Sequence, residues 1–171
     1  MTRYLLDTNL LSYFLNTAHG EALSAAAKKM PMVIVDEVRV ELEAHKSLGA
    51  GAKAWFPESN IELRRITVGS PEHDVLLGLL GGSPVAKDLG ERASIALAST
   101  NAELVFVAND KGGMWIALRE LHLRGERMLG VTSFLRRAHE EASLDVAAID
   151  DVARVAGVPL PTWWGDWRKN L

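Results

Sequence analysis

The sequence predicts an α/β fold with a mostly parallel central sheet flanked by helices. Short apolar segments of strand character alternate along the chain with longer segments of helical periodicity. One of the strand segments, LVFVA at Leu104–Ala108, is apolar throughout, as a buried strand is. No internal repeat, low-complexity segment or domain boundary interrupts the alternation. We therefore expect one domain with its sheet between layers of helices.

Each expected strand is a short apolar or β-branched run. Tyr4–Leu6 and Leu104–Ala108 are uninterrupted, whereas Ile61–Val68 is mixed because charged residues divide it. In chain order, the expected strands are Arg3–Leu6, Met32–Val35, Ile61–Val68, Leu104–Ala108 and Met128–Val131.

The expected helices lie between these strands. Val38, Leu42 and His45 fall on one side of a helix, and Gly81 and Gly125 each follow a helical pattern as a stop signal. The expected helices are Leu10–Leu15, Glu21–Lys29, Val38–His45, Pro71–Leu80, Leu89–Thr100, Trp115–Leu123 and Phe134–Glu141, with helical segments continuing to about Ala156 before Pro159 and Pro161 break the chain.

The length of 171 residues suits a single domain over 1–171, in which 132–171 forms a helical C-terminal extension. That extension ends in a tail with tryptophans at positions 163, 164 and 167. The tail either packs onto the body or presents an aromatic patch to a partner. The segment Gly49–Pro57 fits neither the strand nor the helix pattern.

Composition narrows the class of protein. Apolar residues make up 48% and charged residues 24%, which is ordinary globular usage. The absence of cysteine excludes disulfides and thiolate zinc sites and fits a reducing compartment. No segment resembles a membrane span or a signal peptide, so we expect a cytoplasmic protein without membrane contact. A net charge of -3 disfavours a basic, nonspecific nucleic-acid coat but not a nuclease, whose catalytic acids lower the charge.

Four acidic residues fall where an α/β sheet places its functional site, beyond the carboxyl ends of its strands. Asp7 ends the first strand in RYLLDTNLLSYFL, and Asp110 follows Leu104–Ala108. Glu41 lies in the helix after the second strand, and Glu91 opens an alanine-rich helix. Convergent carboxylates repel one another unless a cation lies between them, and oxygen ligands favour Mg²⁺ or Mn²⁺. Such an ion would activate water for attack on a phosphate.

Each acid also has a purely structural interpretation. Asp7 could cap the helix that begins near Asn9. Asp88 and Glu91 fit a capping box, in which both side chains accept hydrogen bonds from free backbone amides. Asp110 could close a local turn.

The acid of the third helix is ambiguous. Glu41 could pair with His45 or Lys46 on a solvated face. Asp36 and Glu37 lie closer to the end of the second strand and compete with Glu41 for the place in the site. Helical periodicity alone does not choose among the three.

Four motifs together resemble one known family. LLDTNLLSYFL, VRVELEAH, DLGERASIALA and LVFVANDK, in this order from Arg3 to about Val131, are similar to the PIN-domain ribonucleases, especially the toxins of bacterial VapBC-like toxin–antitoxin pairs. The resemblance implies a PIN-like three-layer fold with a recessed acidic site. It also implies one or two Mg²⁺ or Mn²⁺ ions, cleavage of single-stranded or loop RNA by a metal-activated water, an antitoxin protein as partner, and a homodimer.

By position, the family's metal-binding acids correspond to Asp7, Glu41, Glu91 and Asp110. The resemblance implies that Asp7 and Asp110 anchor the principal ion and that Glu41 and Glu91 complete the site directly or through water. Asn9 corresponds to a polar residue that positions the first acid or its water. Many family members carry aspartate where this chain has Glu91, so the resemblance implies a different geometry around the ion here, because glutamate is longer. The tryptophan-rich tail matches no motif of the family.

The remaining polar residues are assigned by context. The histidines at 19, 45, 73, 122 and 139 are scattered, form no HExxH pattern, and are expected to be structural or surface residues. Lys111 is the favoured phosphate contact because it adjoins Asp110. Other candidate phosphate contacts are Lys28, Lys29, Arg64, Arg65, Arg119, Arg124, Arg127, Arg136 and Arg137.

Two other classes of protein remain as alternatives. A different Mg²⁺-dependent phosphate hydrolase would fit a similar sheet, although a haloacid-dehalogenase-type enzyme would have aspartate where this chain has Asn9. No P-loop motif is present. A non-catalytic α/β interaction module would use the acids as caps and would act through its tryptophan-rich tail. Only the metal-dependent enzymes predict that Mn²⁺ stabilises the folded chain.

Overall fold

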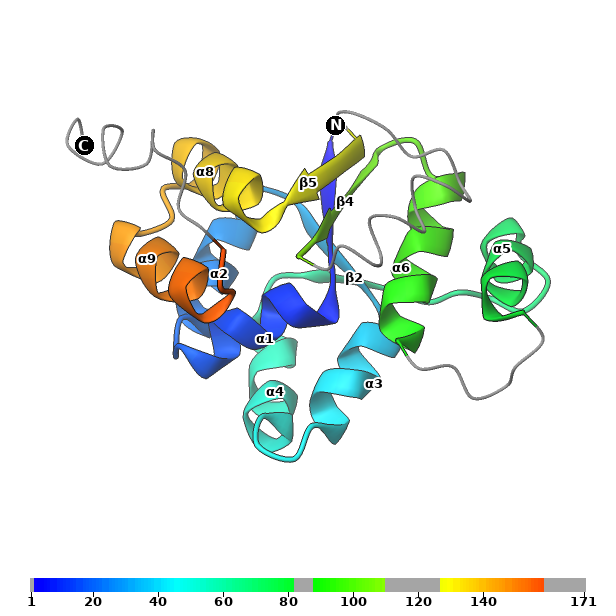
Figure 1. The fold of residues 1–171 in the computed structure, drawn as a ribbon, viewed down its shortest axis with the longest axis horizontal. Helices are drawn as coiled ribbons and strands as arrows, with labels where there is room; N and C mark the ends of the chain where they lie inside the picture. Colours follow the sequence, from blue (N-terminus) through cyan, green and yellow to red (C-terminus); the bar gives the residue numbers. More distant parts are fainter. Residues whose placement is uncertain (1, 82–87, 110–126, 159–171) are drawn as a thin grey trace.

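A computed structural model describes residues 2–81, 88–109 and 127–158. Its centre is a five-stranded sheet in which every strand pair is parallel (Figure 1). The spatial order is β3-β2-β1-β4-β5. The strands are β1 (Arg3–Leu6), β2 (Met32–Val35), β3 (Glu62–Arg64), β4 (Leu104–Ala108) and β5 (Met128–Gly130). The predicted α/β class with a parallel sheet is confirmed.

Helices cover both faces of this sheet (Figure 1). Helices α5 and α6 lie on one side of it, and α2, α8 and α9 lie on the other. None of the helices in the described ranges is long and apolar enough to cross a membrane. The helices are α1 (Thr8–Asn16), α2 (Gly20–Ala27), α3 (Asp36–Ala44), α4 (Gly49–Trp55), the 3₁₀ helix η1 (Phe56–Glu58), α5 (Pro71–Leu80), α6 (Leu89–Thr100), α8 (Val131–Ala142) and α9 (Val146–Val155).

The sheet is built outward from β1. Leu5 of β1 pairs with Val33 of β2 on one side and with Phe106 of β4 on the other. The chain first adds β2 and β3 in one direction and then β4 and β5 in the other. The strand order therefore reverses at β1, and the crevice between the carboxyl ends of β1 and β4 is the place where such sheets bind ligands.

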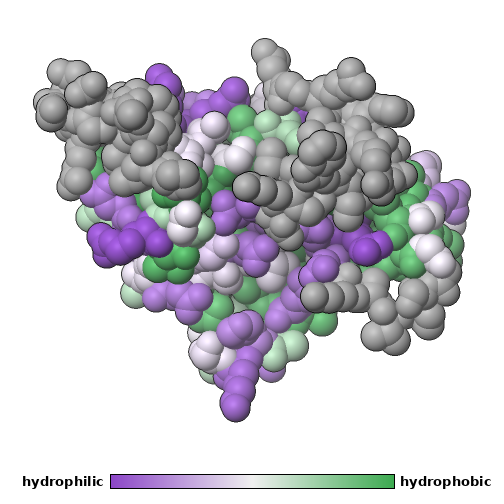
Figure 2. Space-filling view, viewed as in Figure 1, coloured by the Kyte–Doolittle hydropathy of each residue, from purple (hydrophilic) through white to green (hydrophobic). Residues whose placement is uncertain are grey.

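One hydrophobic core joins the layers, whereas hydrophilic and hydrophobic residues are mixed over the face of the molecule drawn in Figure 2. Every residue of β2 and β4 is buried, whereas the edge strands β3 and β5 are partly exposed. Phe134 of α8 and Ile149 of α9 belong to the same buried cluster as the strands. Tyr4 and Phe134 meet edge to face, with ring centroids 6.1 Å apart. Full burial of one such side chain stabilises the fold by about 1.5–3 kcal/mol.

Helix α6 is held at its C-terminal end by a cation. The guanidinium of Arg127 donates hydrogen bonds to the carbonyl oxygens of Ala98, Asn101 and Leu104. These carbonyls lie at and after the end of α6, where helices leave oxygens without a partner inside the helix. A positive charge at this end also complements the helix dipole. Arg127 therefore has a structural role, and we do not retain it as a phosphate contact.

Two expected elements differ from the structure. The expected strand Ile61–Val68 is reduced to β3, because beyond Arg64 the chain leaves the sheet and Val68 is 82% exposed. The unassigned segment Gly49–Pro57 folds into α4 and continues into η1. The expected helix Trp115–Leu123 and the tryptophan-rich tail lie outside the described residues.

Helix α4 starts in close contact with the end of α3. A Cβ added at Gly49 would lie 2.3 Å from the carbonyl oxygen of Glu43, a separation that real Cβ atoms do not reach. The backbone amide of Gly49 also donates to the carbonyl oxygen of His45 at 2.8 Å. Only glycine permits this approach. At Gly51, two residues later in α4, an added Cβ would meet nothing within 4 Å.

These two glycines give a matched pair of variants. Gly49→Ala is expected to lower the free energy of unfolding by about 1–3 kcal/mol, because its methyl group overlaps a backbone oxygen. Gly51→Ala is expected to raise it by about 0.5–1 kcal/mol, because alanine favours the helix and nothing obstructs it. Urea denaturation followed by circular dichroism measures both values. Equal effects of the two substitutions would contradict the close contact.

Candidate functional site

Asp7 lies at the carboxyl end of β1 and is 2% exposed. Its Oδ1 accepts a hydrogen bond of 2.8 Å from the backbone amide of Leu10, so it is the N-cap of α1. The predicted capping role is thus confirmed. A cap fixes the orientation of its carboxyl group, and at this position the group lies at the crevice of the sheet. Capping and ligand binding are compatible here, because a carboxylate has two oxygens.

Glu41 extends from α3 toward α1 and α6. Its Oε2 accepts a hydrogen bond of 2.6 Å from the hydroxyl of Thr8, the first residue of α1. Its Oε1 accepts one of 2.8 Å from the backbone amide of Gly90, in the first turn of α6. An anion is favoured at that end of a helix. The alternative in which Glu41 pairs with His45 or Lys46 on a solvated face is therefore wrong.

Gly90 makes this arrangement possible. A Cβ at this position would lie 2.6 Å from Oε2 of Glu41, 2.9 Å from Oγ1 of Thr8 and 3.0 Å from Cγ2 of Val38. The absence of a side chain lets α6 approach α3 closely enough for its amide to reach the carboxylate. Sequence reasoning missed this residue, although its position directly before Glu91 in DLGER was a usable signal.

A small polar cavity of about 100 Å³ lies beside these groups. Among the described residues, it is lined by Asp7, Thr8, Asn9, Glu41, Asp88 and Glu91. The volume suffices for an ion with several waters. Three of the four acids expected at the site, and the expected helper Asn9, thus share one cavity.

Asp88 was expected only as part of a capping box, and that expectation is wrong. It precedes α6 in a left-handed conformation, with φ of 64°, and its side chain makes no capping hydrogen bond among the described residues. Asp88 is instead one of the residues that line the cavity. Aspartate tolerates this conformation better than most residues. Thr8 is the other lining residue that sequence reasoning missed, although it lies between two predicted site residues in DTN.

The two acids that competed with Glu41 do not line the cavity. Asp36 binds Arg39 at 2.7 Å and Arg65 at 3.4 Å. Glu37 is partly buried, and its Oε2 has no hydrogen-bond partner among the described residues. Desolvation raises the pKa of Glu37, and the negative charges of Asp36 and Glu41 raise it further.

The fourth expected acid, Asp110, and the expected phosphate contact Lys111 lie outside the described residues. The residue before them, Asn109, donates hydrogen bonds to the hydroxyl of Tyr13 at 3.0 Å and to the carbonyl oxygen of Ala156 at 3.1 Å. These contacts place the carboxyl end of β4 against α1 and the end of α9.

The donors fit a hard dication in kind. All the cavity's side chains carry oxygen donors, which suit Mg²⁺ or Mn²⁺ and not the nitrogen- and sulfur-rich sites of zinc. In the described ranges, however, no three Asp, Glu, His or Cys side chains are grouped so that they could hold an ion by themselves. A complete ligand set needs rearrangement of these acids, a donor from outside those ranges, or both.

The histidines make local contacts away from the cavity. His19 pairs with Asp151 at 3.0 Å, and His139 bonds the carbonyl oxygen of Leu144 at 2.7 Å. His45 and His73 use their Nδ1 atoms for the backbone amides of Ser47 and Gly69. The four described histidines thus have structural contacts, as predicted, and His122 lies outside the described residues.

Comparison with known proteins does not assign the chain to a family. No protein-family model matches the chain, and no curated protein or solved structure matches it.

The partly buried carboxyl of Glu37 gives a pH-dependent prediction. Because its pKa is raised in the folded protein, the folded state binds this proton more tightly than the unfolded state does. Stability is therefore expected to fall as pH rises from about the ordinary value of 4.5 through the raised pKa. Glu37→Gln removes this dependence, so the variant should be more stable than the original at pH 7 and should lose that advantage below pH 4.5.

Urea denaturation over a pH series in EDTA measures the difference between the two proteins. Glu58→Gln, at an exposed position, is the matched control and should show no such trend. A Glu37→Gln variant that is less stable at pH 7 would show that the carboxylate has a favourable partner.

Proposed function

We propose that the protein is a Mg²⁺- or Mn²⁺-dependent endoribonuclease that hydrolyses phosphodiester bonds in RNA, and that it acts as the toxin of a toxin–antitoxin pair. The observation that carries the proposal is the shared cavity of Asp7, Glu41 and Glu91 at the carboxyl end of the central strand. The four sequence motifs that resemble PIN-domain ribonucleases assign ligands to the same three acids and to Asp110.

The chemistry of the cavity supports a metal-dependent reaction. Among the described residues, four acids line it, namely Asp7, Glu41, Asp88 and Glu91, and no lysine or arginine does. A dication would relieve the repulsion between them. When bound, Mg²⁺ or Mn²⁺ lowers the pKa of a coordinated water and offsets the charge of the phosphate.

The residues of the chain have distinct roles in this proposal. Asp7 and Asp110 would anchor the ion, with Glu41 and Glu91 completing the site directly or through water. Thr8 and the amide of Gly90 orient the Glu41 carboxylate through their hydrogen bonds. Asn9 is exposed at the cavity and can position the attacking water or a phosphate oxygen.

Loss of single ligands tests the reaction. Asp7→Asn and Glu41→Gln should each reduce Mn²⁺-dependent cleavage of single-stranded RNA by about 100-fold or more. Asn retains the acceptor that caps α1 at Leu10, so the Asp7→Asn chain should still fold. A labelled RNA and gel electrophoresis measure cleavage, which EDTA should abolish. The exposed Asp145→Asn and Glu58→Gln are matched controls. Wild-type cleavage by Asp7→Asn would contradict the site assignment.

Binding of the ion is tested separately from cleavage. At about 100 times its dissociation constant, Mn²⁺ should stabilise the wild-type chain by about 2.7 kcal/mol, because it binds only the folded state. Thermal denaturation with and without Mn²⁺ measures this effect, which Asp7→Asn should remove and Asp145→Asn should leave intact. An unchanged unfolding temperature in the wild type would favour the non-catalytic alternative.

The toxin role has its own test. The resemblance implies a neighbouring small gene for an antitoxin, and a homodimeric toxin. Expression of the chain should arrest bacterial growth, co-expression of that neighbour's product should restore it, and Asp7→Asn should be harmless. Growth curves under an inducible promoter measure all three. A nuclease that cuts RNA in vitro but does not arrest growth would be a ribonuclease without the toxin role.

A further inference from the structure

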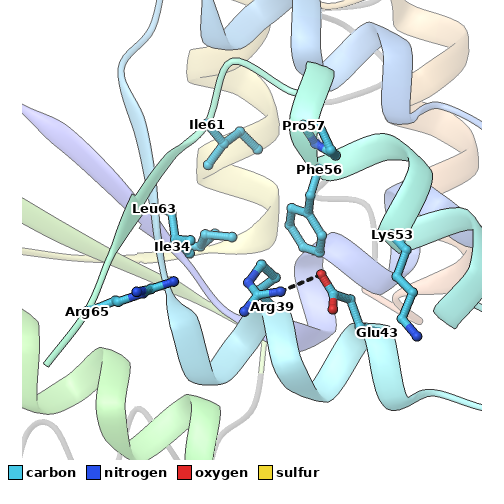
Figure 3. A pocket seen from close by; sticks show the side chains of 9 residues that line it. All are labelled: Ile34, Arg39, Glu43, Lys53, Phe56, Pro57, Ile61, Leu63 and Arg65. Atoms are coloured by element: carbon cyan, nitrogen blue, oxygen red, sulfur yellow. Dashed lines mark hydrogen bonds and ion pairs between the residues drawn. The ribbon is translucent and has the colours of Figure 1, made fainter.

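A second hollow lies on the other side of α3 from the acidic cavity. It has a volume of about 350 Å³, which is in the range of small-ligand sites. Figure 3 shows it between the sheet edge at Ile34 and Leu63, helix α3 at Arg39 and Glu43, and the α4–η1 segment at Phe56. We call this hollow the α3 groove. Residues 39 and 43 lie about 160–200° around α3 from Glu41, so the groove and the acidic cavity are separate.

The floor of the α3 groove is apolar. Ile34 of β2 and Leu63 of β3 are paired in register and present their side chains to the same face of the sheet. Phe56 points into the space above them (Figure 3). Leu63 is 40% exposed, although an apolar side chain next to the core is usually covered. A planar apolar group would cover it and contact the ring of Phe56.

Two cations at the rim are available to a ligand. Arg39 is already bound to Asp36 and Glu43, each at 2.7 Å. Lys53, in contrast, is exposed and forms no ion pair among the described residues. Arg65 is 73% exposed, and its contact with Asp36 is long at 3.4 Å. Figure 3 shows Lys53 and Arg65 at opposite ends of the groove, with Phe56 between them.

The adjacent strand edge does not favour a bound peptide. Strand β3 has three residues, and its two charged side chains are engaged: Arg64 binds Glu62 and Glu103, and Glu62 also binds Arg3. Short, charged edge strands resist pairing with another strand. The recognition features are therefore the aromatic ring and the two separated cations, not the backbone of β3.

We propose that the α3 groove binds one nucleotide of a single RNA strand. The base lies against Phe56 and Leu63, and the phosphates on either side of that nucleotide reach Lys53 and Arg65. Stacking of bases on aromatic rings, with cations along the backbone, is the usual mode of single-strand binding. The choice of RNA as the ligand rests on the proposed ribonuclease function. Because the groove is separate from the acidic cavity, it contributes to affinity and not to the chemical step.

The experiment measures binding without cleavage. Asp7→Asn protein in EDTA is titrated with a fluorescein-labelled single-stranded oligoadenylate, and anisotropy gives the dissociation constant at several salt concentrations. Lys53→Ala should weaken binding and lower the slope of log affinity against log salt by about 0.7, the value for one phosphate contact of a single strand. Lys46→Ala, at an exposed position outside the groove, is the matched control and should leave the slope unchanged.

The aromatic contact is tested by Phe56→Leu, which keeps an apolar side chain against the core and removes the ring. Binding should weaken by about fivefold or more, because stacking of a base contributes at least about 1 kcal/mol. In the background with Asp7 intact, both groove variants should raise the KM for RNA cleavage and leave kcat unchanged. Circular dichroism and urea denaturation confirm that the variants are folded.

The outcomes separate the two proposals. Wild-type affinity and salt slope in Lys53→Ala and Phe56→Leu would overturn the groove assignment while leaving metal-dependent cleavage untouched. RNA binding that depends on the groove residues, in a protein that shows no metal-dependent cleavage, would overturn the proposed nuclease function and support the α3 groove as an RNA-binding site. Adenosine monophosphate that competes as strongly as the oligonucleotide would assign the groove to a free nucleotide. Competition by a polyglutamate peptide would assign the groove to an acidic peptide. Either result would overturn the proposal that the groove binds an RNA strand.

Discussion

The carboxylate of Glu41 holds together the helices at the carboxyl edge of the sheet. Its two oxygens accept hydrogen bonds from the hydroxyl of Thr8 and the amide of Gly90, and so join α3 to α1 and to α6. Three helices that follow different strands are thereby fixed around one cavity. The carboxylate lies at the positive end of α6, where backbone amides and the helix dipole both favour an anion. The acids that line the cavity are consequently carried by elements that this one carboxylate joins.

The chain order of the sheet explains why this edge became the site. Because β2 and β3 extend from one side of β1 and β4 from the other, the strand order reverses at β1, and a crevice opens there at the carboxyl ends of the strands. Asp7 fills the start of the resulting crevice and caps α1 at the same time. Polar residues are accommodated at the carboxyl end of the strand, where the backbone turns into a helix. In the interior of the buried strands, the same polar groups would lose their contact with water and destabilise the fold.

Much of this architecture is readable from the sequence, and the failures have physical causes. The buried strands at Arg3–Leu6, Met32–Val35 and Leu104–Ala108 were predicted with their observed bounds, because uninterrupted apolar runs leave few alternatives. The edge strand β3 was predicted too long, since at an edge a residue can be apolar without being paired. Helix α4 was missed because its two glycines suggest a loop, while one of them is required by a contact with a residue six positions earlier.

The same contrast holds for the candidate site. Asp7, Asn9, Glu41 and Glu91 were identified from their places after strands or at helix starts, and they share the cavity. Asp88 and Gly90 were not identified as residues of the site. The left-handed backbone of Asp88 and the close helix approach at Gly90 leave no periodic pattern in the sequence. Lys53 was likewise passed over in a segment without an assigned structure, so the cations of the α3 groove became visible only when α4 was placed beside β3.

Helix α6 carries a carboxylate at its first turn and a guanidinium at its last carbonyls, since Glu41 binds the amide of Gly90 and Arg127 binds the oxygens of Ala98 and Asn101. Both charges come from other parts of the chain, so the helix is clamped between two oppositely charged side chains that compensate its dipole. Such a helix resists fraying from either terminus. Its backbone amides should therefore exchange with solvent by larger, cooperative openings, and Glu91 is presented from a rigid support.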